Sequence, residues 1–108
     1  MIKPSKVVFI NDKLENSFNS LSKKDPIRKG IVRAIKDLQK NAFAGIQIPK
    51  RLIPKEYIQK YSINNLWKYD LPNSWRLLYT VTPENEVELI SAILEWFNHK
   101  DYEKKMRY

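Results

Sequence analysis

Two short segments near the middle of the chain constrain its fold most strongly. They are LWKYDL (66–71) and WRLLYTV (75–81), and Pro72-Asn73-Ser74 connects them. Both show the two-residue period of apolar side chains that marks a β-strand with one buried face. A three-residue connection pairs Leu71 with Trp75, which unites the two apolar sets on one side of a hairpin. The same register puts three charged residues on the other side: Lys68, Asp70 and Arg76.

Two further strands are expected at the ends of the chain. Residues 6–10 (KVVFI) form a short β-branched and aromatic run, which is typical of a buried strand. Pro83-Glu84-Asn85 is a second turn, and residues 87–96 follow it as a long run that is apolar on both faces. Such a run is typical of a strand with neighbours on both sides.

Two helices are expected between the first strand and the hairpin. Asp12 and Glu15 have the spacing of a capping box, and the residues that follow recur at helical intervals: Leu14, Phe18 and Leu21. The second helix begins at Asp25-Pro26, a capping residue followed by proline at the first helical position. The short connection between the helices predicts an antiparallel helical hairpin.

The second helix is strongly amphipathic. Its apolar stripe consists of Ile27, Ile31, Ile35, Leu38 and Ala42. Its other face carries Lys29, Arg33, Lys36 and Lys40. Gly30 costs about 1 kcal/mol relative to alanine inside a helix, and close packing would explain its presence. Gly45 is expected to end this helical region.

The order of these elements predicts an α+β domain that spans residues 1–108. An N-terminal strand and a helical hairpin would pack on a small antiparallel sheet. The charged tail, residues 99–108, would form one or two helical turns. Residues 46–64 contain Pro49 and Pro54 and show no clear period. No element is assigned to them, although Pro54 is compatible with the start of one short helical turn.

The charge balance narrows the choice of partner. Lys and Arg total 20 against 12 for Asp and Glu, which gives a net charge of +8 and a pI near 9.7. A small domain this basic favours polyanions, although an acidic protein or simple solubility would also suit the charge. The chain has no cysteine and one histidine, which excludes disulfides and thiolate zinc sites. Without a signal peptide or a run of ~20 apolar residues, the expected location is the cytoplasm.

The last third of the chain resembles a known family. The segments LWKYDLPNSWRLLYTV, VELISAILEW and HKDY are similar to the RelE/ParE superfamily of type II toxin–antitoxin systems. Members carry a lysine-containing strand, then an arginine-containing strand, then a basic C-terminal segment. The resemblance covers nearly the whole chain in the order of its elements, and its residue-level likeness lies in these segments.

The resemblance implies a function. RelE-like members are ribosome-dependent mRNA endonucleases that use no metal or other cofactor, and ParE-like members inhibit DNA gyrase. Both are silenced by a cognate antitoxin protein. The single histidine after the last strand favours the RelE-like branch. Two alternatives stay open, a gyrase inhibitor and an inactive basic module that binds RNA or antitoxin.

The resemblance also assigns site residues. Arg76 matches the family's phosphate-binding arginine, and Lys68 matches a second cation on the preceding strand. His99 matches the position of a catalytic arginine or histidine, and histidine is the residue type whose unperturbed pKa lies near neutrality, as proton transfer requires. Tyr102 matches the C-terminal tyrosine, which stacks on a base or orients a proton, and Tyr108 competes for this role.

Four further cations complete the predicted site, and one residue, Asp70, departs from the pattern of the family. RNA contacts are expected from Lys100 in the tail and from the proline-interrupted segment: Lys50, Arg51 and Lys55. Asp70 stands where relatives can have another cation. This carboxylate either pairs with Arg76 across the hairpin or acts as a general base.

Overall fold

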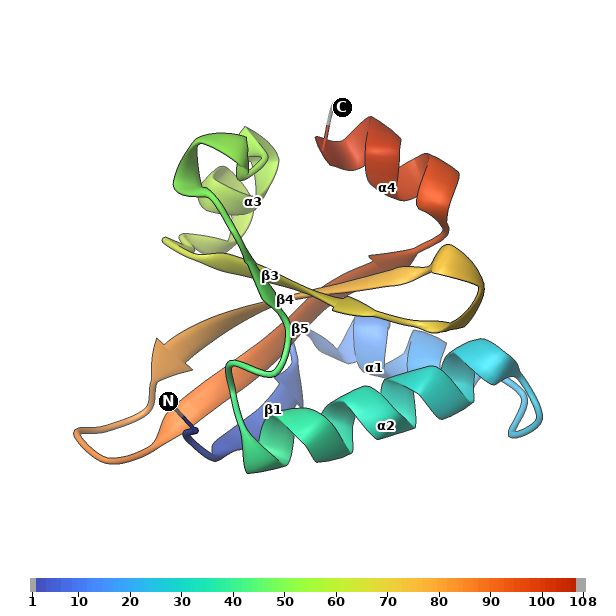
Figure 1. Ribbon diagram of the computed structural model, residues 1–108, viewed down its shortest axis with the longest axis horizontal. Coiled ribbons are helices and arrows are strands. Elements are labelled where there is room, and N and C mark those ends of the chain that lie inside the picture. Colours follow the sequence, from blue (N-terminus) through green and yellow to red (C-terminus); the bar gives the residue numbers. More distant parts are fainter. Residues whose placement is uncertain (1, 107–108) are drawn as a thin grey trace.

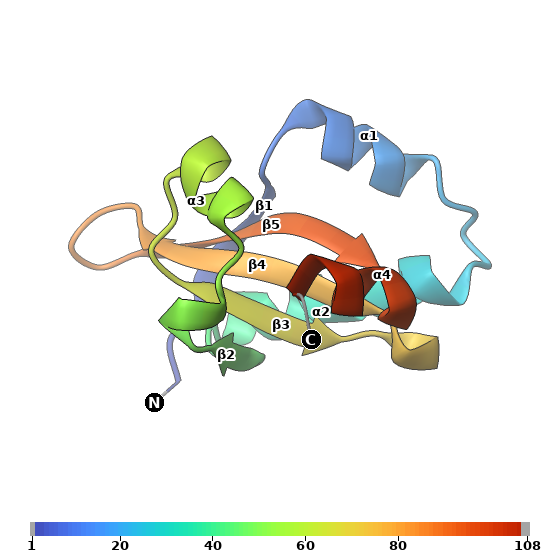
Figure 2. The same ribbon diagram turned by 90° about the horizontal axis from the view of Figure 1, so that it is seen from above.

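A five-stranded sheet with the order β1-β5-β4-β3-β2 separates two groups of helices (Figure 1). The structure is a computed structural model that describes residues 2–106. The strands are β1 (Ser5–Phe9), β2 (Ile46–Ile48), β3 (Leu66–Asp70), β4 (Arg76–Pro83) and β5 (Leu89–Phe97). The helices are α1 (Asp12–Asn19), α2 (Pro26–Lys40), α3 (Lys55–Tyr61) and α4 (His99–Met106). Helices α1 and α2 lie on one side of the sheet, and α3 and α4 lie on the other (Figures 1 and 2).

The predicted α+β class and the central hairpin are confirmed. Strands β3 and β4 are antiparallel, with Asp70 opposite Arg76. The amide of Leu71 donates a hydrogen bond to the carbonyl of Trp75 over 2.9 Å, so the expected pairing closes the turn. The turn residues Asn73 and Ser74 have positive φ angles of 58° and 63°. Strand β5 lies between β1 and β4, as its apolar character predicted.

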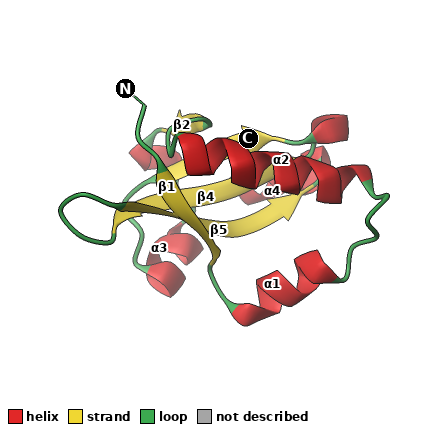
Figure 3. Cartoon of the chain, turned by 90° about the horizontal axis from the view of Figure 1, so that it is seen from below, coloured by secondary structure: helices red, strands yellow, loops and turns green. Residues whose placement is uncertain are grey.

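The predicted antiparallel sheet is confirmed for β3, β4 and β5, and the N-terminal strand, whose direction was not predicted, joins it at one edge. Strand β1 pairs with β5 in parallel, and Val7 lies opposite Ser91. A short apolar run is compatible with either direction, so its composition does not select the partner or the orientation. Helices α1 and α2 run in opposite directions but stand apart in Figure 3. They meet where the guanidinium of Arg28 lies 4.7 Å from the ring centroid of Phe18.

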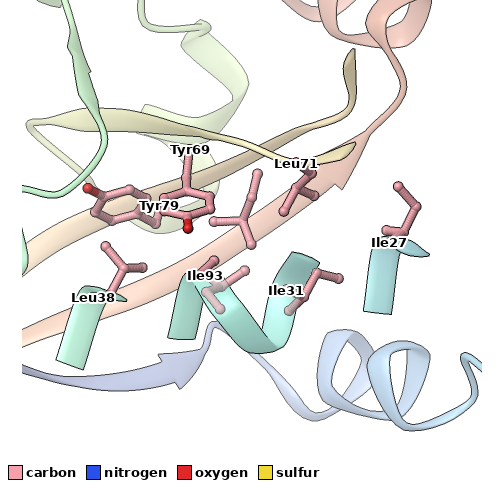
Figure 4. Packing of buried hydrophobic residues seen from close by; sticks show 9 residues of the cluster. Ile27, Ile31, Leu38, Tyr69, Leu71, Tyr79 and Ile93 are labelled. Atoms are coloured by element: carbon pink, nitrogen blue, oxygen red, sulfur yellow. The ribbon is translucent and has the colours of Figure 1, made fainter. Parts of the chain in front are cut away.

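Helix α2 forms as its sequence predicts and supplies the helical side of the first core. The Asp25 side chain accepts a hydrogen bond from the amide of Ile27 over 2.8 Å, and Pro26 begins the helix. Figure 4 shows the apolar stripe of α2 against Tyr69, Tyr79 and Ile93 of the sheet. A Cβ atom on Gly30 would lie 2.6 Å from Cδ of Pro72, so close packing against the β3–β4 turn explains this glycine.

Two predicted helix boundaries are wrong. The cap of α1 is Asn11, whose side chain accepts from the amide of Leu14 over 2.8 Å, and Asp12 is already helical. Asparagine is as good a cap as aspartate, so the spacing of carboxylates misplaced the start. Helix α2 ends at Lys40, before Gly45. Gly45 is needed instead for close contact, because a Cβ atom there would lie 2.4 Å from the carbonyl oxygen of Lys68.

The unassigned segment, residues 46–64, covers the second face of the sheet. It contains β2, a 3₁₀ turn at Lys50–Leu52 and α3. Together with α4 it encloses a second core, whose buried members are Ile48, Ile53, Tyr57, Leu66, Leu78, Leu94, Phe97, Tyr102 and Met106. None of the helices within residues 2–106 is long and apolar enough to cross a membrane.

Strand β5 contains a bulge that changes which side chains reach this second face. Leu78 lies opposite Glu95, whereas the next residue of β4, Tyr79, lies opposite Ile93. Leu94 is therefore the extra residue, and both Leu94 and Glu95 are directed to the side of α3 and α4. The strand also begins at Leu89, two residues later than expected, and Val87 is 89% exposed in the preceding turn.

Candidate functional site

Two of the predicted cations converge on the predicted tyrosine. Arg76 begins β4, and Lys68 lies on the same face of the neighbouring strand β3. Cζ of Arg76 is 5.7 Å from the ring centroid of Tyr102, and Nζ of Lys68 is 5.8 Å from it. At these distances both cations are attracted to the ring. We call Lys68, Arg76 and Tyr102 the cation–tyrosine cluster.

The position of Tyr102 follows from the start of α4. The side chain of Asn98 accepts a hydrogen bond from the amide of Asp101, and its carbonyl accepts one from the amide of Tyr102, both over 2.8 Å. The helix therefore turns back over the sheet immediately after β5. Tyr102 packs edge-to-face on Phe97 with ring centroids 5.9 Å apart, and it is only 2% exposed. Tyr102 thus belongs to the core and also lies on the two cations.

Arg76 has an unusual set of partners. Its Nε lies 3.1 Å from Oδ1 of Asp70, so the predicted cross-strand ion pair is present. Its Nη1 donates to the carbonyl of Trp75 over 3.2 Å. The Nε atom is buried. Its contact with Asp70 is an ion pair that does not have the geometry of a hydrogen bond, and Nε makes no other hydrogen bond within the described residues. An anionic ligand at this arginine would therefore compete with Asp70 for the guanidinium.

The contact of His99 lies within its own helix. It is the first residue of α4, it is exposed, and its Nε2 contacts Oε1 of Glu103 one helical turn later. This i,i+4 partner orients the imidazole. In the part of the chain that the structure describes, no hydrogen bond or ion pair joins His99 to Lys68 or Arg76. The structure therefore brings Lys68, Arg76 and Tyr102 together and leaves His99 at the exposed end of α4.

The other predicted RNA contacts are exposed on the side of α3 and α4. Lys50 and Arg51 occupy the 3₁₀ turn, Lys55 begins α3, and Lys100 follows His99. None of these four side chains makes an ion pair among residues 2–106. They are exposed cations that are not part of the cation–tyrosine cluster. Tyr108, the alternative to Tyr102, lies outside the described residues.

A second set of interacting polar residues was not predicted from the sequence. The hydroxyl of Tyr57 donates a hydrogen bond to Oε1 of Glu95, and burial raises the pKa of this tyrosine far above its ordinary value. Lys105 contacts Glu56, lies 3.8 Å from Oε1 of Glu95, and stands 5.1 Å from the ring centroid of Tyr57. These four residues link α3, α4 and β5. Glu95 is the one carboxylate in the largely apolar strand β5, and this exception in the sequence is the signal that could have identified the group.

Comparisons with known proteins add no relative. The chain matches no protein-family model, no curated protein and no solved structure. Within residues 2–106, no three or more His, Cys, Asp or Glu side chains gather as a group that could hold a metal ion.

Proposed function

We propose that this chain is the toxin of a type II toxin–antitoxin system and cleaves mRNA at the ribosome without a metal or other cofactor. The observation that carries the proposal is the cation–tyrosine cluster. Lys68 and Arg76 lie over one aromatic ring, and the carboxylate that pairs with Arg76 is largely exposed to solvent, so an anionic ligand can displace it. A phosphodiester can bind both cations and take the place of the Asp70 carboxylate at the guanidinium. A cognate antitoxin would then be required in the same cytoplasm.

The cleavage step requires two proton transfers. The 2′-oxygen of one nucleotide attacks the adjacent phosphorus and gives its proton to a base. The bond from phosphorus to the 5′-oxygen then breaks, and this oxygen takes a proton from an acid, which leaves a 2′,3′-cyclic phosphate and a 5′-hydroxyl. Arg76 and Lys68 stabilise the charge that accumulates on the phosphorane. His99, oriented by Glu103, is the residue we assign to proton transfer, and Tyr102 positions the cations.

One observation favours a second candidate, an inactive basic module that binds RNA or an antitoxin. Asp70 places a carboxylate against Arg76, and this carboxylate would repel a phosphate. Tyr102 is almost fully buried, and its ring covers one side of the Arg76 guanidinium, which limits the access of a ligand from that side. In such a module the basic surface would still bind an acidic protein.

Induction of the chain in a bacterial host tests the proposal. Translation and the 5′ ends of mRNA are followed over minutes for the wild type, Arg76→Ala and His99→Ala. Lys36→Ala is the matched control, because Lys36 is exposed on α2 at the other side of the sheet. We expect rapid arrest with new internal 5′ ends for the wild type and the control, and a loss of both in Arg76→Ala and His99→Ala.

Other outcomes contradict the proposal. Arrest without new 5′ ends, together with loss of DNA supercoiling, would identify a gyrase inhibitor. No arrest from a folded chain that still binds an acidic partner would identify the inactive module. Circular dichroism of the purified variants establishes that each one is folded before its activity is compared.

A further inference from the structure

A cavity of about 250 Å³ opens at the edge of β5, where β1 has already ended. It lies between α1 and α3, and β5 and α4 complete its walls. The residues that matter for its chemistry are Lys13, Lys60, Lys105, Tyr61 and Glu95. Three lysines face two carboxylates there, since Glu56 also lines the cavity, so its net charge is positive. None of these residues belongs to the cation–tyrosine cluster.

An aromatic surface forms one wall of the cavity. The rings of Tyr57 and Tyr61 are stacked with centroids 6.2 Å apart and planes at 30°. Tyr57 is buried, whereas Tyr61 is only partly buried and borders the open space. A planar aromatic ring supported from behind by a second ring is a surface on which a nucleobase can stack.

A hydrogen-bond acceptor stands beside this aromatic wall. The bulge in β5 directs Glu95 to this side of the sheet, and the hydroxyl of Tyr57 holds its carboxylate in place. The Glu95 side chain is still 38% exposed, and a carboxylate can accept more hydrogen bonds than the one from Tyr57. Guanine presents two adjacent N–H donors, its ring N1–H and its 2-amino group, whereas uracil has one and no amino group. A carboxylate in this position favours guanine.

Two lysines can hold a phosphate at the mouth of the cavity. Lys13 extends from α1 and Lys60 from α3, and neither makes an ion pair within the described part of the chain. Nζ of Lys60 lies over the ring of Tyr61, 5.3 Å from its centroid, so a stacking base would displace this exposed side chain, and the displaced ammonium can bind the phosphate. A nucleotide needs this combination of a flat apolar surface and a nearby cation.

We propose that this cavity is a subsite for a guanine nucleotide of the RNA substrate. Tyr61 would stack on the base, Glu95 would accept its N–H donors, and Lys13 and Lys60 would bind its phosphate. Glu95 lies opposite Leu78, two residues along β4 from Arg76. Strand geometry then separates the Cα atoms of Glu95 and Arg76 by roughly 8 Å, a distance that one strand of RNA can bridge. The inference rests on the proposed action on RNA and adds a base preference to it.

Nucleotide titrations test the subsite without requiring cleavage. The purified chain is titrated with 5′-GMP, AMP, CMP and UMP while backbone amide signals are followed by NMR. We expect GMP to shift signals of α1, α3 and residues 94–95, and to bind about tenfold more tightly than UMP, the discrimination typical of one well-placed base contact. Glu95→Gln should remove most of this preference, and Lys36→Ala should leave it unchanged.

Two further variants keep the test decisive if Glu95→Gln fails to fold. Tyr61→Leu removes the stacking surface, and Lys60→Ala removes an exposed cation. Each should weaken the binding of GMP several-fold. Equal affinity for the four nucleotides, shifts confined to residues around Arg76, or unchanged GMP binding in all three variants would overturn the subsite.

The cleavage assay separates this inference from the proposed function. If the wild type cuts RNA without any guanine preference at the new 5′ ends and shows no selective GMP binding, the subsite is wrong and the nuclease stands. If GMP binds selectively through Glu95 but no RNA is cut, the nuclease is wrong and the cavity is a nucleotide site of a binding protein.

Discussion

The carboxylate of Asp70 faces Arg76 across the β3–β4 hairpin, with Oδ1 3.1 Å from Nε. The two partners are exposed to very different degrees, because 64% of the Asp70 side chain is accessible and only 20% of the Arg76 side chain is. A solvated carboxylate can turn away at little cost, whereas the arginine is fixed by the strand, the carbonyl of Trp75 and the ring of Tyr102. Asp70 therefore competes with any anion for Arg76.

Replacement of Asp70 by asparagine should strengthen RNA binding. Loss of the competing charge should increase affinity several-fold at low salt, and the slope of log K against log salt should become steeper by up to about one unit. Fluorescence anisotropy with a single-stranded RNA at several salt concentrations measures both quantities. Glu86→Gln, which removes an exposed charge from the β4–β5 turn, is the control. Abolished cleavage with intact binding would instead identify Asp70 as the general base.

The ring of Tyr102 should matter more than its hydroxyl for binding. Tyr102→Phe keeps the surface on which Lys68 and Arg76 lie, so RNA affinity should stay within about twofold of the wild type. Tyr102→Ala empties a buried site in the second core and should lower the free energy of unfolding by about 3–5 kcal/mol. Urea denaturation measures the stability. Lost cleavage with preserved binding in Tyr102→Phe would assign a proton-transfer role to the hydroxyl.

Alanine at Gly30 should destabilise the fold although it favours the helix. The new Cβ atom would lie 2.6 Å from Cδ of Pro72 and 3.2 Å from Cδ2 of Leu71. Helix propensity contributes about 1 kcal/mol in favour of alanine, but overpacking typically costs 1–3 kcal/mol, so we expect a small net loss of stability. Thermal unfolding is the measurement, with the exposed Lys36→Ala as control. A higher melting temperature for Gly30→Ala would show that the turn moves away without cost.

Tyr79 should contribute to stability in a pH-dependent way. Its buried hydroxyl donates to the carbonyl of Ala42 over 2.9 Å and accepts from the amide of Gly45 over 3.0 Å. Tyr79→Phe leaves these two groups without this partner, which should cost about 1–3 kcal/mol at neutral pH.

The sign of the pH dependence follows from burial, which raises the pKa of Tyr79 from 10.0 to about 12. Between these two values the folded state retains a proton that the unfolded state loses, so stability falls as the pH rises from 10 to about 12. Burial raises the pKa values of Tyr57 and Tyr69 as well, and both act in the same direction. The fall should be shallower in Tyr79→Phe than in the wild type, as measured by urea denaturation at several pH values. Parallel curves would contradict a titrating Tyr79.

The sequence by itself determined the elements whose signals come from residues close together along the chain. The alternation in residues 66–81 predicted the hairpin, its register and the face that carries Lys68, Asp70 and Arg76. Asp25-Pro26 and the apolar stripe predicted α2 and its buried side. These are periodic or capping signals within one segment, so they can be interpreted without a partner. Residues 46–64 lack such a period, so β2 was missed, and α3 was anticipated only as a helical turn that begins at Pro54.

Only the tertiary structure decided how these elements meet. The direction of β1, the bulge that turns Glu95 toward α3, and the close approach at Gly45 all depend on residues distant in sequence. The same holds for the candidate site, where Tyr102 lies on Lys68 and Arg76 while His99 pairs within its own helix. Local periodicity gives the inward face of an element, but packing between elements selects which side chains of two such faces come into contact.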